Sequence, residues 1–171
     1  MPMIDAFVPD GALRPDAEAR MIKEITDKLI ELEGLDPGSE RIQAVSVVYL
    51  HRPRVFVGGA AAAEPRYRFI PSVPEGQYTE LARAGVVREI TAAVARAEGK
   101  PFDQVAPRVW VFPNEVTDGR WGGRGIIRRL PDIIAFLAGT EAGEAARERL
   151  ARRRREAAAA TLRALVATSG E

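Results

Sequence analysis

The chain has 171 residues, 46% of them apolar, which is enough to bury the core of one domain or of two small packed halves. Its 25 basic and 24 acidic residues nearly cancel, so neither a nucleic acid nor a membrane is an expected partner. The lack of cysteine and the single histidine exclude disulfides, thiolate chemistry and histidine-rich metal sites, and we expect no metal. No basic leader with an apolar core and no apolar run of roughly 18 residues is present, so we expect a cytoplasmic protein.

The first elements expected along the chain are a strand, a helix and a second strand. Met3–Val8 is a short apolar run that stops at the turn formers Pro9–Gly11. A helix opens near Pro15, since proline is tolerated in the first turn, and it ends at Gly34. Apolar residues fall at helical spacing in between: Ile22, Ile25, Leu29 and Leu32. A second strand is predicted over Gln43–Leu50.

The same pattern then returns. Shifting the sequence by 65 residues lays Val8–Gly34 on Val73–Gly99 with ten of twenty-seven positions identical, where ordinary composition gives about two or three. With one residue deleted, Val45–Val48 falls on Val109–Phe112. The second copy predicts a strand, a helix and a strand, at Tyr67–Val73, about Thr79–Glu98 and Arg108–Phe112.

The repeat predicts the fold class. Two strands joined by a crossover helix run parallel, so each copy is a β-α-β unit that is too small to be stable alone. Side by side, the two units predict an α+β fold with a four-stranded sheet and two helices on one face. We place the units at 2–62 and 66–127 of one domain, 1–130, and a C-terminal helical extension at 131–171. The bare face of the sheet is not clearly polar, so we expect it to meet another subunit.

The extension is rich in alanine and arginine. A short apolar helix over 126–139 is expected to break at Pro131, and a long helix is expected over Thr140–Val166. Its stretch RERLARRRRE is either a basic arm for an acidic partner or a solvated or subunit-packing helix. We favour the second interpretation, in which the arginines pair with acidic residues of the same helix, Glu141, Glu144, Glu148 and Glu156.

Pro2 is the residue that points to chemistry. Because its side chain is short, we expect methionine aminopeptidase to remove Met1 and leave a proline with a free secondary amine. Free α-amino groups titrate at about 7.7 to 8.0, and burial or a nearby guanidinium lowers that pKa further. Such an amine can act as a general base near pH 7, as a general acid if its pKa stays high, or as a nucleophile toward a carbonyl.

A Met-Pro start, a strand, a DG or EG turn, a helix, a strand and a Gly-Gly hairpin, all written twice, resemble the tautomerase superfamily. The likeness covers Pro2 to about Gly125. It is nearest to fused two-unit members of the cis-3-chloroacrylic acid dehalogenase-like group, through RVFVGG at Arg54–Gly59, VWVF at Val109–Phe112 and EITD at Glu24–Asp27. The resemblance implies a homotrimer without a cofactor, a small carboxylate-bearing substrate, and the terminal proline as catalytic base or acid.

Carried over position by position, the resemblance makes Pro2 the catalytic residue. It places a substrate-binding arginine at Arg14, after the first turn, and a pocket aromatic at Trp121, before Gly122 and Gly123. Trp121 could equally be a subunit-interface residue. The other candidates for substrate binding follow the second turn, end a strand or flank Trp121: Gln77, Tyr78, Phe112, Arg120 and Arg124.

The chain also departs from the dehalogenase pattern. Leu29 stands where that group has a histidine, Pro74 and Gln77 stand where it has two arginines, and Phe112 stands where it has a tyrosine. Hydrolytic dehalogenation is therefore disfavoured. His51 follows the first-half strand, and we interpret it as a loop histidine without a catalytic role.

We therefore expect a cofactor-independent tautomerase or isomerase that moves a proton between carbon and oxygen of a small enol or 2-oxo acid. A hydratase, decarboxylase or dehalogenase on the same scaffold is an alternative, and so is a catalytically idle oligomer that serves as a binding module. Arg14 and the pair Arg120 and Arg124 favour an anion site and hence an enzyme. The missing histidine and turn arginines favour an idle protein.

Overall fold

The computed structural model describes residues 2–168. These residues form two compact units. Unit 1 comprises the chain up to Val73 together with Tyr78–Glu115, and unit 2 comprises Pro74–Gln77 and the chain from Val116 onward. No helix among the described residues is both long enough and apolar enough to cross a membrane.

The sheet has the strand order β2-β1-β5-β6, and β7 also pairs with β5. These strands are β1 (Met3–Phe7), β2 (Val47–His51), β5 (Tyr67–Pro74), β6 (Val109–Val111) and β7 (Asn114–Val116). β1 runs parallel to β2 and antiparallel to β5, and β5 runs parallel to β6. The predicted α+β fold is confirmed, with the four expected strands in one sheet and β7 as a fifth.

The duplication is visible in the pairing of β1 with β5. Met3 pairs with Ser72, and the residues that a shift of 65 relates to this pair, Arg68 and Phe7, pair with each other. An internal two-fold axis therefore exchanges β1 with β5, as expected for two equal units that lie side by side.

The second strand of each unit is one residue away from the register that the sequence match suggested. Met3 lies beside Val47, and its counterpart Arg68 lies beside Trp110, so Val47 corresponds to Trp110 and not to Val111. The predicted strand also begins later than expected, because residues 40–43 form the short helix α2 (Glu40–Gln43). Both segments are apolar runs, so composition alone did not distinguish the two registers.

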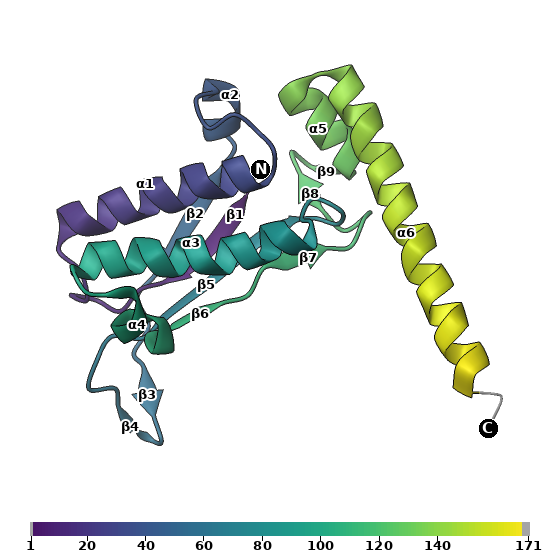
Figure 1. Cartoon of the computed structure of the whole chain (residues 1–171). Helices are drawn as coiled ribbons and strands as arrows, with labels where there is room; N and C mark the ends of the chain where they lie inside the picture. Colours follow the sequence, from purple (N-terminus) through teal and green to yellow (C-terminus); the bar gives the residue numbers. More distant parts are fainter. Residues whose placement is uncertain (1, 169–171) are drawn as a thin grey trace. The chain divides into compact units, whose positions relative to one another are not determined.

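Helices α1 (Pro15–Leu32) and α3 (Glu80–Glu98) lie side by side on one face of the sheet (Figure 1). The hydroxyl of Thr79 caps α3 by accepting a hydrogen bond from the amide of Ala82 at 3.1 Å. Both helices end at a glycine with positive φ, Gly34 at 76° and Gly99 at 66°, a conformation that glycine adopts without a Cβ clash. The helices of the two units therefore stop at matched positions.

The core of unit 1 lies between these helices and the inner face of the sheet. Alternate strand residues point toward it, as the two-residue period of a strand requires. Its largest members are Tyr67, Tyr78 and Phe69. Aliphatic members come from β1, β5, α1 and α3: Ile4, Val73, Met21, Ile25, Leu29, Val86, Ile90 and Val94.

The opposite face of the sheet carries no helix from the described part of unit 1. Three aromatic side chains are about half exposed on it, Tyr49 (53%), Trp110 (59%) and Phe112 (47%). The guanidinium carbon of Arg68 lies over the ring of Phe7 (5.4 Å) and over that of Phe112 (5.2 Å). His51 ends β2 on this face and hydrogen-bonds Asp5 at 2.7 Å.

Short elements complete unit 1: the hairpin β3 (Phe56–Val57) and β4 (Ala60–Ala61), the helix α4 (Phe102–Val105) and the 3-10 turn η1 (Ala106–Arg108). The hairpin turns at Gly58 and Gly59, as the sequence predicts.

Unit 2 consists mainly of a small hairpin and two helices. The hairpin is formed by β8 (Gly122–Gly123) and β9 (Ile126–Ile127), and the helices are α5 (Leu130–Ala138) and α6 (Thr140–Thr168). Pro131 lies in the first turn of α5, where a proline is tolerated, so it begins this helix instead of breaking it.

Helix α6 holds the turn Pro74–Gln77 within unit 2. Arg154 donates from Nε and Nη2 to the two carboxylate oxygens of Glu75, at 3.0 and 2.8 Å. These hydrogen bonds hold the pKa of Glu75 at about 2. Arg149 donates to the carbonyl of Gly76 at 3.1 Å and to Oε1 of Gln77 at 3.4 Å. Arg149 and Arg154 therefore find partners outside their own helix, whereas Arg152 lies 4.0 Å from Glu156 within α6, as expected from the sequence.

Candidate active site

Pro2 lies at an edge of the sheet where the ends of two helices meet. The crossover helix α1 runs antiparallel to β1, so its last turn lies at the edge where β1 starts. Because β5 also runs antiparallel to β1, the start of α3 lies at the same edge (Figure 1). Pro2 is buried, and its carbonyl accepts a hydrogen bond from the amide of Val47 at 3.2 Å. The beginning of β1 is thus part of the packed structure.

Glu33 is also buried at this edge, and its side chain is polar. It follows the last residue of α1, and only 7% of it is exposed. Burial raises the pKa of its carboxyl group. Glu33 was not predicted as a site residue, because a glutamate at a helix end is usually solvated. The available signal was the identical Glu-Gly pair at the end of both helices.

Tyr78 precedes α3 and is also buried, with 2% of it exposed. Its amide donates to Oε1 of Glu115 at 3.2 Å, and Oε2 of Glu115 accepts from Nη1 of Arg83 at 3.1 Å. Burial raises the pKa of Tyr78, and the charges of Glu33 and Glu115 raise it further. The phenol therefore stays protonated at neutral pH and can donate a hydrogen bond to an oxygen.

The second β-α-β unit shows a matching edge with different residues. By the shift of 65, Tyr67 takes the place of Pro2 and Glu98 takes the place of Glu33. The phenol of Tyr67 donates a hydrogen bond to Oε1 of Glu98 at 2.8 Å. In the second unit, the strand residue at this position thus contacts the glutamate that ends the helix.

Cations neutralise Glu98. Arg108 donates to its two carboxylate oxygens at 2.8 and 2.7 Å, and Nζ of Lys100 lies 3.0 Å from one of them. Burial acts to raise the pKa of Glu98, but hydrogen bonds from Arg108, Lys100 and the Tyr67 phenol outweigh it and hold the pKa at about 2. In the first unit Leu35 takes the place of Lys100, and Val45 takes that of Arg108.

Two other predicted site residues of unit 1 lie away from Pro2. Phe112 follows β6 on the open face of the sheet, where it contacts Arg68. Arg14 precedes α1 at the opposite edge, with 80% of its side chain exposed and an ion pair to Asp16 at 3.8 Å. The 18 residues of α1 span about 27 Å, so Arg14 can reach a site at Pro2 only from a second chain.

The remaining predicted residues belong to unit 2. Gln77 and Trp121 are buried, with 5% and 7% exposed, and Arg120 is exposed. Arg124 occupies the tip of the β8–β9 hairpin with a φ of 54°, and its guanidinium carbon lies 5.5 Å from the ring centre of Phe136. The structure therefore groups these four residues in one unit and groups Pro2 with Tyr78 in the other.

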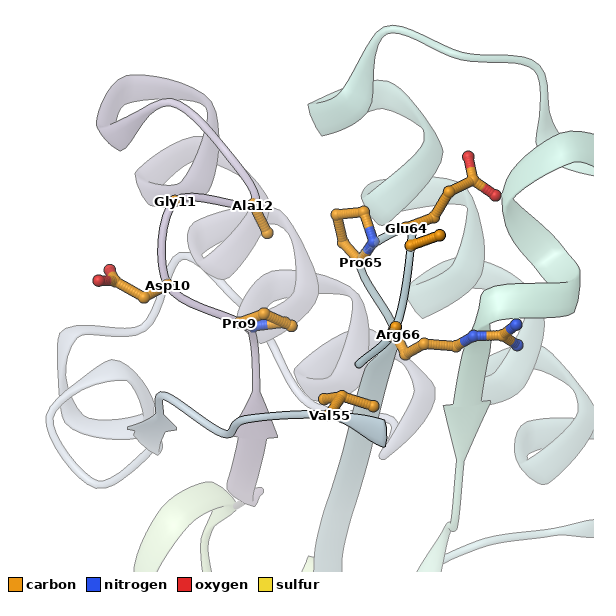
Figure 2. A pocket seen from close by; sticks show the side chains of 10 residues that line it. Pro9, Asp10, Gly11, Ala12, Val55, Glu64, Pro65 and Arg66 are labelled. Atoms are coloured by element: carbon orange, nitrogen blue, oxygen red, sulfur yellow. The ribbon is translucent and has the colours of Figure 1, made fainter. Parts of the chain in front are cut away.

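A hollow of about 240 Å³ lies at the other end of β1 (Figure 2). It is bounded by the turn Pro9–Ala12, by Val55 and by the segment Ala62–Arg66. Figure 2 shows the rings of Pro9 and Pro65 beside the hollow, whereas the charged ends of Asp10, Glu64 and Arg66 point away from it. Because no polar side chains converge there, the edge at Pro2 is the better candidate for proton chemistry.

No protein-family model and no curated protein sequence matches the chain. Solved structures do. Fused 4-OT has a TM-score of 0.59 at 17% identity, over 73% of this chain and 94% of that chain. N1, a member of the cis-3-chloroacrylic acid dehalogenase family, has a TM-score of 0.61 at 16% identity, and the match covers 83% of this chain and 96% of N1. Macrophage migration inhibitory factor of Toxoplasma gondii has a TM-score of 0.56 at 15% identity, and the match covers 74% of this chain and 99% of that chain.

The chain therefore has the fold of the tautomerase superfamily, as its duplicated β-α-β units and its sequence resemblance predict. Within that fold it has the fused arrangement, in which one chain carries both units.

Proposed function

We propose that the protein is a cofactor-independent tautomerase acting on a small enol or 2-oxo acid, with the amine of Pro2, freed by removal of Met1, as general base. The observation that carries this proposal is the burial of Pro2 at the edge where Glu33 and Tyr78 are also buried. Burial disfavours the charged form of an amine, and the uncharged form is the base that the reaction needs. The fold shared with fused 4-OT and with N1 supports the class of enzyme.

The proposed reaction needs a base, a stabilised oxygen and an anchor for the carboxylate. The Pro2 amine removes a proton from the substrate and returns it at another atom. Tyr78 donates a hydrogen bond to the oxygen on which negative charge develops. The other predicted roles remain proposals: Arg14 of a second chain, Arg120 and Arg124 as ligands of the substrate carboxylate, and Gln77, Phe112 and Trp121 as further substrate-binding residues.

We also propose that the active form is a homotrimer. Three of the similar structures are described as trimers of fused 4-OT. The open face of the sheet carries half-exposed aromatic side chains, which a subunit contact would remove from water. Assembly would also bring Arg14 of one chain toward the Pro2 edge of another.

The proposal is tested by ketonisation of phenylenolpyruvate and 2-hydroxymuconate with the parent protein and with Pro2→Ala. We expect a loss of about 100-fold or more in kcat/KM for the variant. Alanine is also small enough for removal of Met1, so the loss reports the ring amine and not a retained methionine. Intact mass must show chains that start at residue 2, because a retained Met1 makes the nitrogen an amide. Equal rates for parent and variant would remove the proline mechanism.

A hydratase, decarboxylase or dehalogenase is the second candidate. The observation in its favour is Glu33, because a carboxylate near an amine stabilises the protonated amine, which is a general acid. Release of halide from a 3-haloacrylate by the parent and not by Pro2→Ala, with no ketonisation by either protein, would select this alternative.

A further inference from the structure

The proposed function leaves the buried carboxyl group of Glu33 without a role. We propose that Glu33 is a second catalytic residue, which exchanges a proton with the substrate oxygen while Pro2 exchanges one with the substrate carbon. This role rests on the proposed function, because it requires a free amine at Pro2.

The second β-α-β unit supplies the geometry. There, Tyr67 and Glu98 are in direct contact through a hydrogen bond of 2.8 Å. Helices α1 and α3 end at matched glycines, and the pairing of β1 with β5 is symmetric under the same shift of 65. The matched positions therefore imply that Glu33 is directed at Pro2 as Glu98 is directed at Tyr67. Proline is much shorter than tyrosine, so the proposal places a small planar substrate where the phenol lies in the second unit.

The charges around the two glutamates differ. Glu98 is fixed as a carboxylate by Arg108 and Lys100, whereas Val45 and Leu35 stand at the corresponding positions of the first unit. Burial raises the pKa of Glu33, so this carboxyl group takes up a proton more readily than the carboxylate of Glu98 does.

Other ionisable groups also face this edge. Tyr78 lies within the electrostatic range of Glu33 and Glu115, and Glu115 is paired with Arg83 at 3.1 Å. The Glu115–Arg83 pair holds its charges in a fixed arrangement. Glu33 is thus the carboxyl group at this edge that is suited to exchange a proton during the reaction.

The proposed cycle balances. The neutral amine of Pro2 takes a proton from the carbon next to the carbonyl, and the electron pair of that C–H bond forms the carbon–carbon double bond. The electron pair of the carbonyl π bond takes a proton from the carboxyl group of Glu33 and forms the enol hydroxyl. The enzyme is left with an ammonium and a carboxylate, and transfer of one proton from Pro2 to Glu33 restores the starting state. Ketonisation follows the same steps in reverse. No oxidant, reductant or cofactor is consumed.

The test compares Glu33→Gln with Glu98→Gln, the same change at the matched position of the second unit. We expect Glu33→Gln to lower kcat by about 100- to 10,000-fold and to remove one limb of the pH–rate profile. Glu98→Gln is expected to lower the thermal stability while keeping the pH profile of the parent. Glu33→Asp is expected to retain both limbs of the profile at a reduced kcat, because it keeps the acid one methylene farther from the substrate.

A readout that does not depend on turnover is the pH dependence with which an electrophile such as 3-bromopyruvate alkylates Pro2, followed by mass spectrometry. We expect the midpoint to fall by about one pH unit or more in Glu33→Gln, because a nearby carboxylate stabilises the ammonium. If Glu33→Gln does not fold, Glu33→Asp decides the question by the same two measurements. The proposal is wrong if the variant keeps the kcat, the pH profile and the alkylation midpoint of a Pro2-dependent parent. A parent whose activity does not depend on Pro2 would instead overturn the proposed function.

Discussion

The ion pair of Glu98 and Arg108 is expected to be a major contributor to the stability of unit 1. Their side chains are 5% and 4% exposed, so solvent screens the pair little. The pKa of Glu98 is lowered from 4.5 to about 2. At about 1.4 kcal/mol per pKa unit, this lowering corresponds to about 3 kcal/mol. Glu98→Gln also leaves the buried guanidinium of Arg108 with only the exposed carboxylate of Glu64, 3.7 Å away, so we expect a loss of about 3 to 5 kcal/mol at pH 7.

The pH dependence follows from the sign of the shift. Because the folded state holds the carboxylate more strongly than the unfolded state does, its stabilisation is complete above pH 4.5 and is lost as the pH falls through about 2. Urea unfolding followed by circular dichroism at pH 7, 5 and 3, at one protein concentration, measures the effect. The difference between parent and variant should shrink at pH 3.

A matched control is Glu31→Gln on α1. Glu31 pairs with Lys28 at 2.7 Å, but their side chains are 45% and 42% exposed. We expect a change of at most about 1 kcal/mol there. A difference for Glu98→Gln no larger than that of this control, or one that stays constant down to pH 3, would refute the assignment.

Two further predictions concern unit 2 and the open face of the sheet. Arg154→Ala should weaken the contact of α6 with Glu75 and speed hydrogen exchange in α6. Because the side chains of Arg154 and Glu75 are 48% and 24% exposed, the free energy of unfolding should fall by about 1 kcal/mol or less. Unchanged hydrogen exchange would contradict the contact. Trp110→Ser should shift the protein toward monomers in sedimentation velocity, whereas Leu81→Ser, at a residue 84% exposed on α3, should not; equal assembly of both variants would argue against the open face as the interface.

The duplicated fold could be predicted from the sequence because the repeat fixes both the strands and the helix ends. Gly34 and Gly99 end their helices as predicted, since a left-handed residue at a helix end has a clear sequence signature. The register of β2 could not be predicted, because two apolar runs match in either of two alignments. The short helix α2 takes up residues that decide between them.

The site was only partly accessible to sequence reasoning. Pro2 was predicted from the family resemblance and Tyr78 from its position after a turn, and their roles stay predictions. Glu33 was not predicted as a site residue, because its burial depends on the packing of the helix end against the sheet. The helix arginines were expected to pair with nearby glutamates, and Arg152 does pair with Glu156. Arg154 instead binds Glu75, which is 79 residues away and becomes a neighbour only in the folded chain.

The two halves of the molecule also provide an experiment within one chain. Glu33 and Glu98 are the same amino acid on copies of the same scaffold, in the same solvent and at the same temperature. The double substitution Val45→Arg with Leu35→Lys would place the cations of the second unit at the matching positions of the first. It would measure how far neighbouring residues determine the pKa of a glutamate carboxyl group.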